Sequence, residues 1–290
     1  MSQAKALQVL LLAVLLFGGV WPLTKYGFQY ATPLWFGFSR AALAAVSAAA
    51  LMVAMGRLRF PRARDWSATA AVGLLQIGSY FGLAHMALSL IPAGRTAILG
   101  NVTIFWLVPL SVWLLGEKVS RRRWIAAGVG LVGVGVMTGP WAIDWSAPGV
   151  LAGHAMLLGA SLSWSLAILV MRLRPPVTPV VDLLPWIFLL GALVLLPLAL
   201  WREPFSQGGG IGMGAFWPAA FIGLVAAPIG TWATVEAGRH LNAVVASVGF
   251  LLVPLFGVTL AITWLGEPLD WDLIAGGSLV MLSVLIAAKG

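Results

Sequence analysis

The chain alternates between long apolar stretches and short polar segments, and the apolar stretches dominate. Ten of them are long enough, or nearly so, to cross roughly 30 Å of hydrocarbon as a helix. Lipid offers the backbone no hydrogen-bond partner, so such segments must be helical. The alternating pattern of a transmembrane barrel is absent. We predict an all-α membrane protein with spans near 7–27, 33–55, 67–88, 93–115, 124–139, 149–171, 183–201, 214–236, 242–264 and 272–288.

The pattern also repeats, because the fourth and ninth stretches both end in Leu-Gly-Glu. The copies are VWLLGEKV at 112–119 and ITWLGEPL at 262–269. Each closes the fourth span of a set of five, and an odd number of crossings makes the second set enter the membrane from the opposite side. We predict two inverted five-helix repeats, residues 1–140 and 141–290, that form one unit. Glu117 and Glu267 should cap or anchor helix ends at the two membrane faces.

Charged residues make up only 9% of the chain and hydrophobic residues 61%, with a mean hydropathy of +0.99. A soluble fold could not cover itself with so few polar residues. If Lys5 is cytoplasmic, 13 of the 17 Lys and Arg residues fall on that side. The positive-inside rule therefore predicts that both termini are cytoplasmic, and the family resemblance described below implies the bacterial inner membrane. The net charge of +8 is explained by the cytoplasmic loops of a membrane protein. It does not indicate nucleic-acid binding, since no soluble basic surface with stacking aromatics is evident.

The inventory of reactive side chains is sparse. Cysteine is absent, and His85, His154 and His240 are scattered along the chain. Neither a metal cluster nor a nucleophile assembly is visible, and there is no Walker A motif for ATP hydrolysis. We expect no enzyme activity, no metal and no cofactor.

Several segments resemble a known family. LLGEKVSRRRWIAAGVGLVGVGVM and WLGEPLDWDLIAGGSLVMLSVL are similar to the EamA domains of the drug/metabolite transporter superfamily. Arg40 in WFGFSRAALAA matches the arginine usual early in the second helix of such a domain. The resemblance covers the whole chain and implies ten helices and transport of a small molecule. In overall character the chain most resembles bacterial aromatic amino-acid exporters of the YddG type. The second half departs from the pattern, with Pro185, Trp186 and Ile187 near the place of the arginine.

Transporters built from inverted repeats bind substrate near the middle of the membrane. Polar groups at that depth are costly unless paired, so mid-span polar and aromatic side chains are candidates. Each of these residues also has an ordinary structural alternative. Hydroxyls can bond their own helix backbone, and amides and Trp rings can belong to the core. His85 can bond a hydroxyl instead of relaying protons. The substrate-binding residues predicted are Gln76, Tyr80, His85, Asn101, Thr103, Trp164, Trp232 and Ser247.

The absence of certain charges narrows the substrate. The first span has no acidic residue, unlike small multidrug transporters, and 242–264 has no Lys or Arg, unlike phosphate-ester carriers of this superfamily. Arg40 is expected either to bond a carbonyl structurally or to hold a substrate carboxylate. Aromatic faces and helix ends suit an aromatic or other hydrophobic amino acid. We predict a monomeric exporter of such amino acids that works by alternating access through a central cavity. The alternatives are export of another neutral drug or metabolite, and a channel.

Alternating access needs hinges, and Pro109, Pro254 and the pair Gly18-Gly19 with Pro22 are candidates. Fixed kinks are the alternative. Pro254→Ala is predicted to reduce export more than it reduces the protein level.

Overall fold

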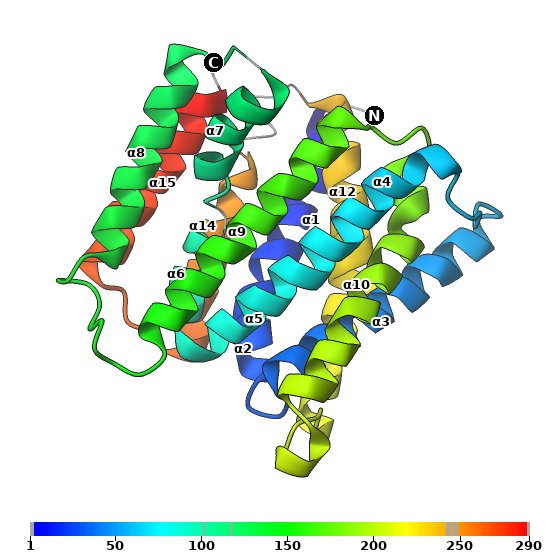
Figure 1. Cartoon of the computed structure of the whole chain (residues 1–290), viewed down its shortest axis with the longest axis horizontal. Coiled ribbons are helices and arrows are strands. Elements are labelled where there is room, and N and C mark those ends of the chain that lie inside the picture. Colours follow the sequence, from blue (N-terminus) through cyan, green and yellow to red (C-terminus); the bar gives the residue numbers. More distant parts are fainter. Residues whose placement is uncertain (1–2, 101, 117, 242–244, 246–248, 289–290) are drawn as a thin grey trace.

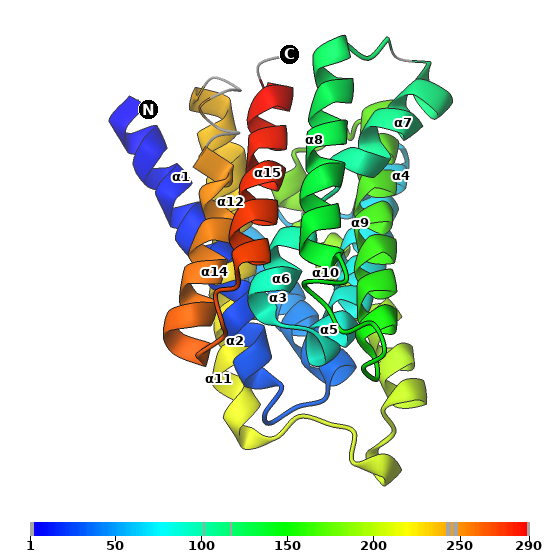
Figure 2. The same ribbon diagram turned by 90° about the vertical axis from the view of Figure 1, so that its left-hand side faces the viewer.

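The computed structural model describes residues 3–100, 102–116, 118–241, 245 and 249–288. Within these ranges the chain is helical apart from turns and a bridge between Ala31 and Ile211. The helices lie side by side in one bundle (Figures 1 and 2). The prediction of an all-α protein is confirmed for this part of the chain.

Six helical stretches of the described residues are long and apolar enough to cross a membrane. They correspond to the first, second, third, sixth, seventh and eighth stretches expected from the sequence. Shorter apolar helices lie at the fourth, ninth and tenth. The six are Gln3–Gly27, Pro33–Ala54, Ala63–Leu90, Val150–Leu173, Val180–Arg202 and Met213–His240.

The helices of the first half are α1 (Gln3–Gly18), α2 (Val20–Gly27), α3 (Pro33–Ala54), η1 (Ala63–Asp65), α4 (Trp66–Ala70), η2 (Ala71–Tyr80), α5 (Phe81–Leu90), α6 (Ala93–Leu99), α7 (Ile104–Leu115) and α8 (Arg121–Thr138). Those of the second half are α9 (Val150–Leu173), α10 (Val180–Arg202), η3 (Phe205–Gln207), η4 (Met213–Ala215), α11 (Phe216–Ala220), η5 (Phe221–Ala226), α12 (Ala227–His240), α14 (Leu252–Leu265) and α15 (Trp271–Ala288).

Elements of the two halves begin at matching positions. The 3₁₀ turn η1, the short helix α4 and the π-helix η2 are followed 150 residues later by η4, α11 and η5, which have the same three conformations. The helices α8 and α15 show the same spacing. Gly116 and Gly266, from the two Leu-Gly-Glu copies, both end a helix in the left-handed region, with φ of 63° and 68°. This correspondence supports the predicted duplication.

The helices α8 and α15 pack along one side of the bundle (Figure 2). A Cβ atom on Gly133 would lie 2.7 Å from the carbonyl oxygen of Gly276, and a Cβ on Gly276 would lie 2.5 Å from that of Gly133. Only glycine allows the two backbones to approach so closely. The glycine-rich helices α8 and α15 are therefore closely packed.

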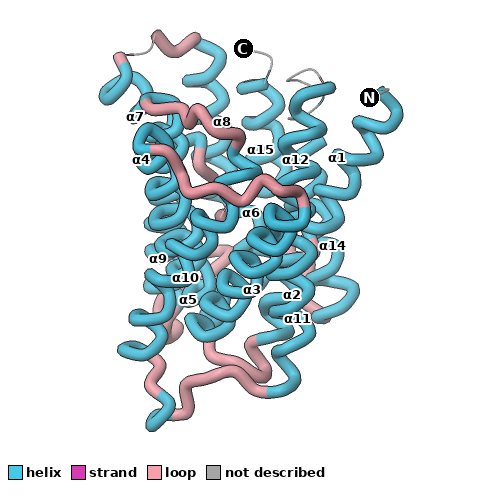
Figure 3. The backbone as a smooth tube through the Cα atoms, turned by 90° about the vertical axis from the view of Figure 1, so that its right-hand side faces the viewer, coloured by secondary structure: helices cyan, strands magenta, loops and turns pink. Residues whose placement is uncertain are grey.

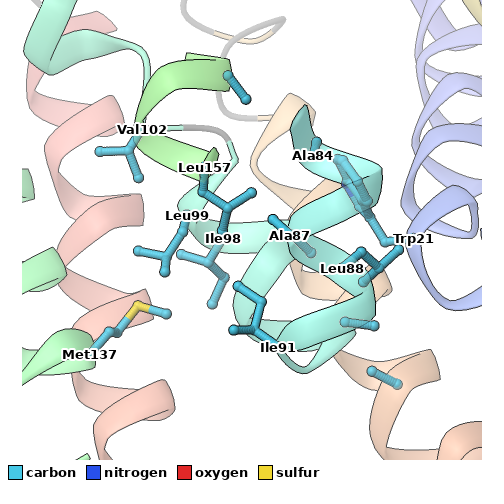
Figure 4. Packing of buried hydrophobic residues seen from close by; sticks show 14 of the residues in the cluster. Trp21, Ala84, Ala87, Leu88, Ile91, Ile98, Leu99, Val102, Met137 and Leu157 are labelled. Atoms are coloured by element: carbon cyan, nitrogen blue, oxygen red, sulfur yellow. The ribbon is translucent and has the colours of Figure 1, made fainter. Parts of the chain in front are cut away.

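The largest cluster of buried hydrophobic residues lies around α6 (Figure 4). It joins Trp21 of α2, Leu88 of α5, Ile98 of α6, Met137 of α8 and Leu157 of α9. The short helix α6 is thus enclosed by helices from both halves of the chain. This packing fixes the position of α6 and of the break that follows it, where the candidate site lies.

The start of α1 and the end of α15 lie at the same end of the bundle (Figures 1 and 2). The α3–η1 connection and the start of α8, which carry most of the arginines, lie toward this end as well. The α2–α3 and α10–η4 connections lie at the opposite end (Figure 3). The two arginine-rich segments predicted to share one side of the membrane therefore lie at one end of the bundle, whereas the orientation itself stays a prediction.

Candidate functional site

The fourth apolar stretch is interrupted within the bundle. The sequence suggested one span over 93–115, but α6 ends at Leu99 and α7 begins at Ile104. The Tyr80 hydroxyl donates to the carbonyl of Gly100, which caps α6, at 3.3 Å. Non-helical backbone at membrane depth is tolerated where it is buried in protein or lines a cavity, and broken helices form the binding sites of many transporters. The break therefore marks the place to look for a site.

Four aromatic residues from three parts of the chain meet beside this break, and we call them the aromatic cluster: Trp21 of α2, Tyr80 at the end of η2, Phe81 of α5 and Trp164 of α9. The ring centroids of Tyr80 and Trp164 are 4.8 Å apart, and those of Trp21 and Tyr80 are 6.3 Å apart. These pairs are edge-to-face, which the ring quadrupoles favour. Trp21 and Tyr80 are buried, whereas Phe81 and Trp164 are partly exposed. The cluster thus has an enclosed side and an accessible side.

Arg40 of α3 adds a buried positive charge to the aromatic cluster. Its guanidinium carbon lies 3.9 Å from the centroid of the Phe81 ring, and its Nη1 lies 3.2 Å from His85 Nε2. The side chain is only 8% exposed, and within the described part of the chain no carboxylate pairs with it. A buried cation that is held by a π-face and one ring nitrogen keeps donors available for an anion.

His85 supports Arg40. A guanidinium has donors only, so His85 Nε2 must accept, and the proton then sits on Nδ1, 3.2 Å from the carbonyl oxygen of Pro33. The ring is fully buried and contacts Phe28, Phe36 and Phe81. This geometry matches a neutral histidine that positions Arg40, and it favours this role over a proton relay.

The structure brings three of the eight predicted residues together: Tyr80, His85 and Trp164. Gln76 lies four residues before Tyr80 on η2 and is half-buried. Thr103 caps the start of α7, and its carbonyl accepts a hydrogen bond from the Ser165 hydroxyl at 3.2 Å, next to Trp164. Thr103 therefore lies beside the aromatic cluster, whereas Gln76 is linked to it only by its position on η2.

The other three predicted residues do not join the aromatic cluster in the described structure. Trp232 lies on α12 with 42% of its surface exposed, and among the described rings it has no contact with the cluster. Asn101 and Ser247 lie outside the described residues. Their roles stay predictions.

Sequence reasoning missed Trp21 and Phe81. Trp21, next to Pro22 near the end of the first predicted span, is not among the residues predicted from the sequence. Phe81 carries no polar group and was passed over beside Tyr80. The adjacent aromatics Tyr80 and Phe81 were a usable signal, but only the packing of α2 against α5 and α6 shows that Trp21 faces them.

Two charged side chains hold the corner between α5 and α6. Lys25 Nζ donates to the carbonyl oxygens of Leu88, at 2.5 Å, and Ile91, at 3.0 Å. Glu267 accepts hydrogen bonds from the backbone amides of Ala93, at 2.6 Å, and Gly94, at 2.8 Å. The expectation that Glu267 caps a helix end is confirmed. Its counterpart Glu117 lies outside the described residues.

Arg95 forms a buried ion pair close to the same corner. Its Nη2 lies 2.8 Å from Asp272 Oδ2, and its Nη1 donates to the carbonyl of Met137. Both side chains of the pair are less than 10% exposed. The contacts join α6 to α8 and α15, so they anchor the short helix that precedes the break.

Comparisons with known proteins find similar sequences among transporters and a similar fold among solved structures. Over 97% of its length the chain is 27% identical to the uncharacterized transporter YvbV of Bacillus subtilis (strain 168), of which it covers 92%. Over 99% of its length it is 25% identical to a probable terminal-alkyne amino-acid exporter of Streptantibioticus cattleyicolor, of which it covers 94%. A crystal structure with 18% sequence identity has the same fold, with a TM-score of 0.66 over 99% of this chain and 98% of the other.

A profile of the EamA-like transporter family matches the chain twice, at residues 4–139 and 151–288. The two matches fall on the two halves in which helices recur at matching positions, and together they cover nearly all of the chain. The protein is thus a member of the EamA-like transporter family, as the resemblance of its sequence implied.

Proposed function

We propose that this transporter exports amino acids with aromatic or other hydrophobic side chains across the bacterial inner membrane by alternating access. The observation that carries the proposal is the aromatic cluster beside the buried Arg40, at the break between α6 and α7. Aromatic rings and one cation without a carboxylate partner, at a broken helix, are complementary to an apolar side chain joined to a carboxylate.

Each part of such a substrate has a matching group. The half-buried rings of Phe81 and Trp164 offer faces to an apolar or aromatic side chain. Arg40 offers guanidinium donors to the carboxylate. The carbonyl of Gly100, at the open end of α6, is an acceptor that an ammonium group could share with Tyr80. A substrate that lacks the carboxylate would leave the charge of Arg40 unpaired.

The name of the Streptantibioticus cattleyicolor relative supports an amino-acid substrate, since that protein is described as a probable terminal-alkyne amino-acid exporter. The finer resemblance to exporters of the YddG type stays a prediction. Export of another neutral drug or metabolite is the main alternative, and a channel is the second.

The same proposal includes the arrangement in the membrane. Residues 1–140 and 141–290 would form two inverted five-helix repeats, and the matching starts of their helices support this. The termini would be cytoplasmic, since the ends of the chain and most arginines lie at one end of the bundle. A single chain holds the whole aromatic cluster, which favours a functional monomer.

Counterflow in liposomes tests the proposal. Purified protein is reconstituted into vesicles loaded with unlabelled amino acid, and uptake of each member of a radiolabelled panel is measured. We expect aromatic and large hydrophobic amino acids to accumulate, and amine analogues without the carboxylate to fail. Exchange of no amino acid would overturn the proposal. Flux without counterflow would favour a channel.

A further inference from the structure

A pocket of about 380 Å³ lies at the arginine-rich end of the bundle, away from the aromatic cluster. It opens between the segment that joins α3 to η1 and the segment that leads into α10. We call it the basic pocket, and its walls include Arg57, Arg59, Phe60 and Arg62 from the first segment, Thr178 from the second, and Asp182 from the first turn of α10.

The pocket holds more positive than negative charge. Arg57 Nη2 lies 2.6 Å from Asp182 Oδ1, so these two charges compensate each other. Arg59 and Arg62 have no ion-pair partner among the described residues, and both are exposed. Two guanidinium groups are therefore left to attract an anion, and their planar donors match phosphate oxygens.

A nearby carboxylate, Asp65, forms no ion pair with them in the described structure. Asp65 is fully buried, and its Oδ1 accepts a hydrogen bond from the backbone amide of Val177 at 2.7 Å. Its Oδ2 accepts the hydroxyl of Thr178 at 2.6 Å. The carboxylate is thus occupied in fixing the wall of the pocket that leads into α10.

Aromatic side chains place the pocket at the depth of the lipid headgroups. Trp66 and Trp186 pack on the Phe60 ring with centroid distances of 5.3 and 4.9 Å. The indole N–H of Trp186 donates to the carbonyl of Arg59 at 2.9 Å, which holds the arginine segment in place. Tryptophan is typical of the membrane–water interface. Phe60 is 67% exposed, so an apolar ring stands beside the two available cations.

We propose that the basic pocket binds the phosphate headgroup of an anionic phospholipid, with Arg59 and Arg62 on the phosphate and Phe60 against the start of an acyl chain. Basic pockets between transmembrane helices bind anionic headgroups in this way. Free inorganic phosphate shares the anion but has no apolar part for Phe60. The lipid is therefore the ligand to which both features of the pocket are complementary.

Titration of the delipidated full-length protein with short-chain lipids, followed by native mass spectrometry, tests the proposal. Phosphatidylglycerol should bind about tenfold more tightly than phosphatidylcholine, because two arginines add to the attraction. Inorganic phosphate in a third arm should displace phosphatidylglycerol only weakly. Equal affinity for the two lipids would overturn the proposal, and so would displacement by phosphate at concentrations matching those of the lipid.

Variants locate the site. Arg59→Gln/Arg62→Gln should remove the preference for phosphatidylglycerol, whereas Arg121→Gln/Arg123→Gln removes the same charge from exposed positions outside the pocket and should keep it. The single change Phe60→Ala should weaken both lipids and leave their ratio above one. If the double variant in the pocket retained the preference while eluting as folded protein, the proposal would be wrong. If the double variant did not fold, the single change Arg62→Gln should reduce the preference for phosphatidylglycerol. An unchanged preference in that single variant would also contradict the proposal.

Discussion

The residues of the candidate site show how a charge can be kept inside a membrane bundle. Arg40 rests on the Phe81 ring and donates to His85, which in turn donates to Pro33. A cation–π contact in a desolvated place contributes about 2 kcal/mol, which offsets part of the burial cost. The remaining cost explains why a charge inside a span is usually functional.

Trp164→Ala should lower the rate of amino-acid counterflow about tenfold, because it removes a ring face proposed to pack on the substrate side chain, a contact worth roughly 0.5–1.5 kcal/mol. The matched control is Trp201→Ala, since that ring is 73% exposed at the end of α10. The measurement is the initial rate per reconstituted protein molecule. Equal rates for the two variants would remove Trp164 from the site.

His85→Leu should lower the thermal stability of the purified protein. It leaves Arg40 and the Pro33 carbonyl without their partner, and an unsatisfied buried group costs about 1–3 kcal/mol. His240→Leu is the control, since His240 lies at the end of α12 and is mostly bonded within its own last turn. The midpoint of unfolding in detergent should drop more for His85→Leu; the reverse order would contradict the supporting role of His85.

At the scale of helices, acidic residues that follow one helix cap the start of another. Glu203, just after α10, accepts hydrogen bonds from the amides of Leu34 and Trp35 at the start of α3. Glu267, after α14, does the same for α6. Carboxylates at these places satisfy open amides and interact favourably with the helix dipole. Such caps join helices far apart in the sequence.

Glu267→Ala should destabilise the protein by about 1 kcal/mol or more, the usual cost of losing a helix cap. The effect should be seen as a lower midpoint of thermal unfolding. The comparison is Glu236→Ala, whose carboxylate contacts, among the described residues, Arg239 at 3.6 Å and His240 at 3.5 Å on its own helix. If Glu236→Ala were the more damaging change, the capping role of Glu267 would be refuted.

The structure changes what is expected of the two proline hinge candidates. Pro109 lies inside α7, where it removes a helix hydrogen bond, and is therefore a true kink candidate. Pro254 lies in the first turn of α14, where the amide has no helical partner in any case. Pro254 therefore removes no hydrogen bond from α14, which weakens the case for a hinge there.

We now expect Pro109→Ala to reduce the export rate severalfold at unchanged protein level, because it restores a continuous hydrogen-bond ladder in α7. Pro254→Ala should change the rate by less than about twofold, since a first-turn proline removes no helix hydrogen bond. Counterflow rates of the two variants, normalised to the amount of reconstituted protein, decide between them. A larger loss of counterflow rate with Pro254→Ala would indicate that the hinge lies in the ninth apolar stretch and not in α7.

At the scale of the whole molecule, the proposed orientation follows from the gathering of arginines at one end of the bundle. Cysteine labelling tests it cleanly, because the chain has no cysteine of its own. Ser206→Cys in η3 and Ala63→Cys in η1 introduce exposed thiols at opposite ends. In intact cells, a membrane-impermeant maleimide should label Ser206→Cys and spare Ala63→Cys. The opposite labelling would invert the orientation.

The features that depend on local pattern could be predicted from the amino-acid sequence alone. Long apolar stretches require helices, the Leu-Gly-Glu pair marks corresponding helix ends, and the family resemblance indicated a transporter of the kind that the family match shows. These follow from the cost of unpaired backbone groups in lipid, which any segment of this composition must meet alone.

Which side chains meet depends on how the helices pack, and the sequence pattern does not show it. The break after Leu99, the aromatic cluster, and the capping of α6 by Glu267 join residues up to 174 positions apart. Gln76, Trp164 and Trp232 looked equivalent in the sequence, since each is a polar or aromatic residue in mid-span, yet only Trp164 packs into the aromatic cluster. Hydropathy gives the depth of a residue, whereas the direction that its side chain faces depends on how the helices pack against one another.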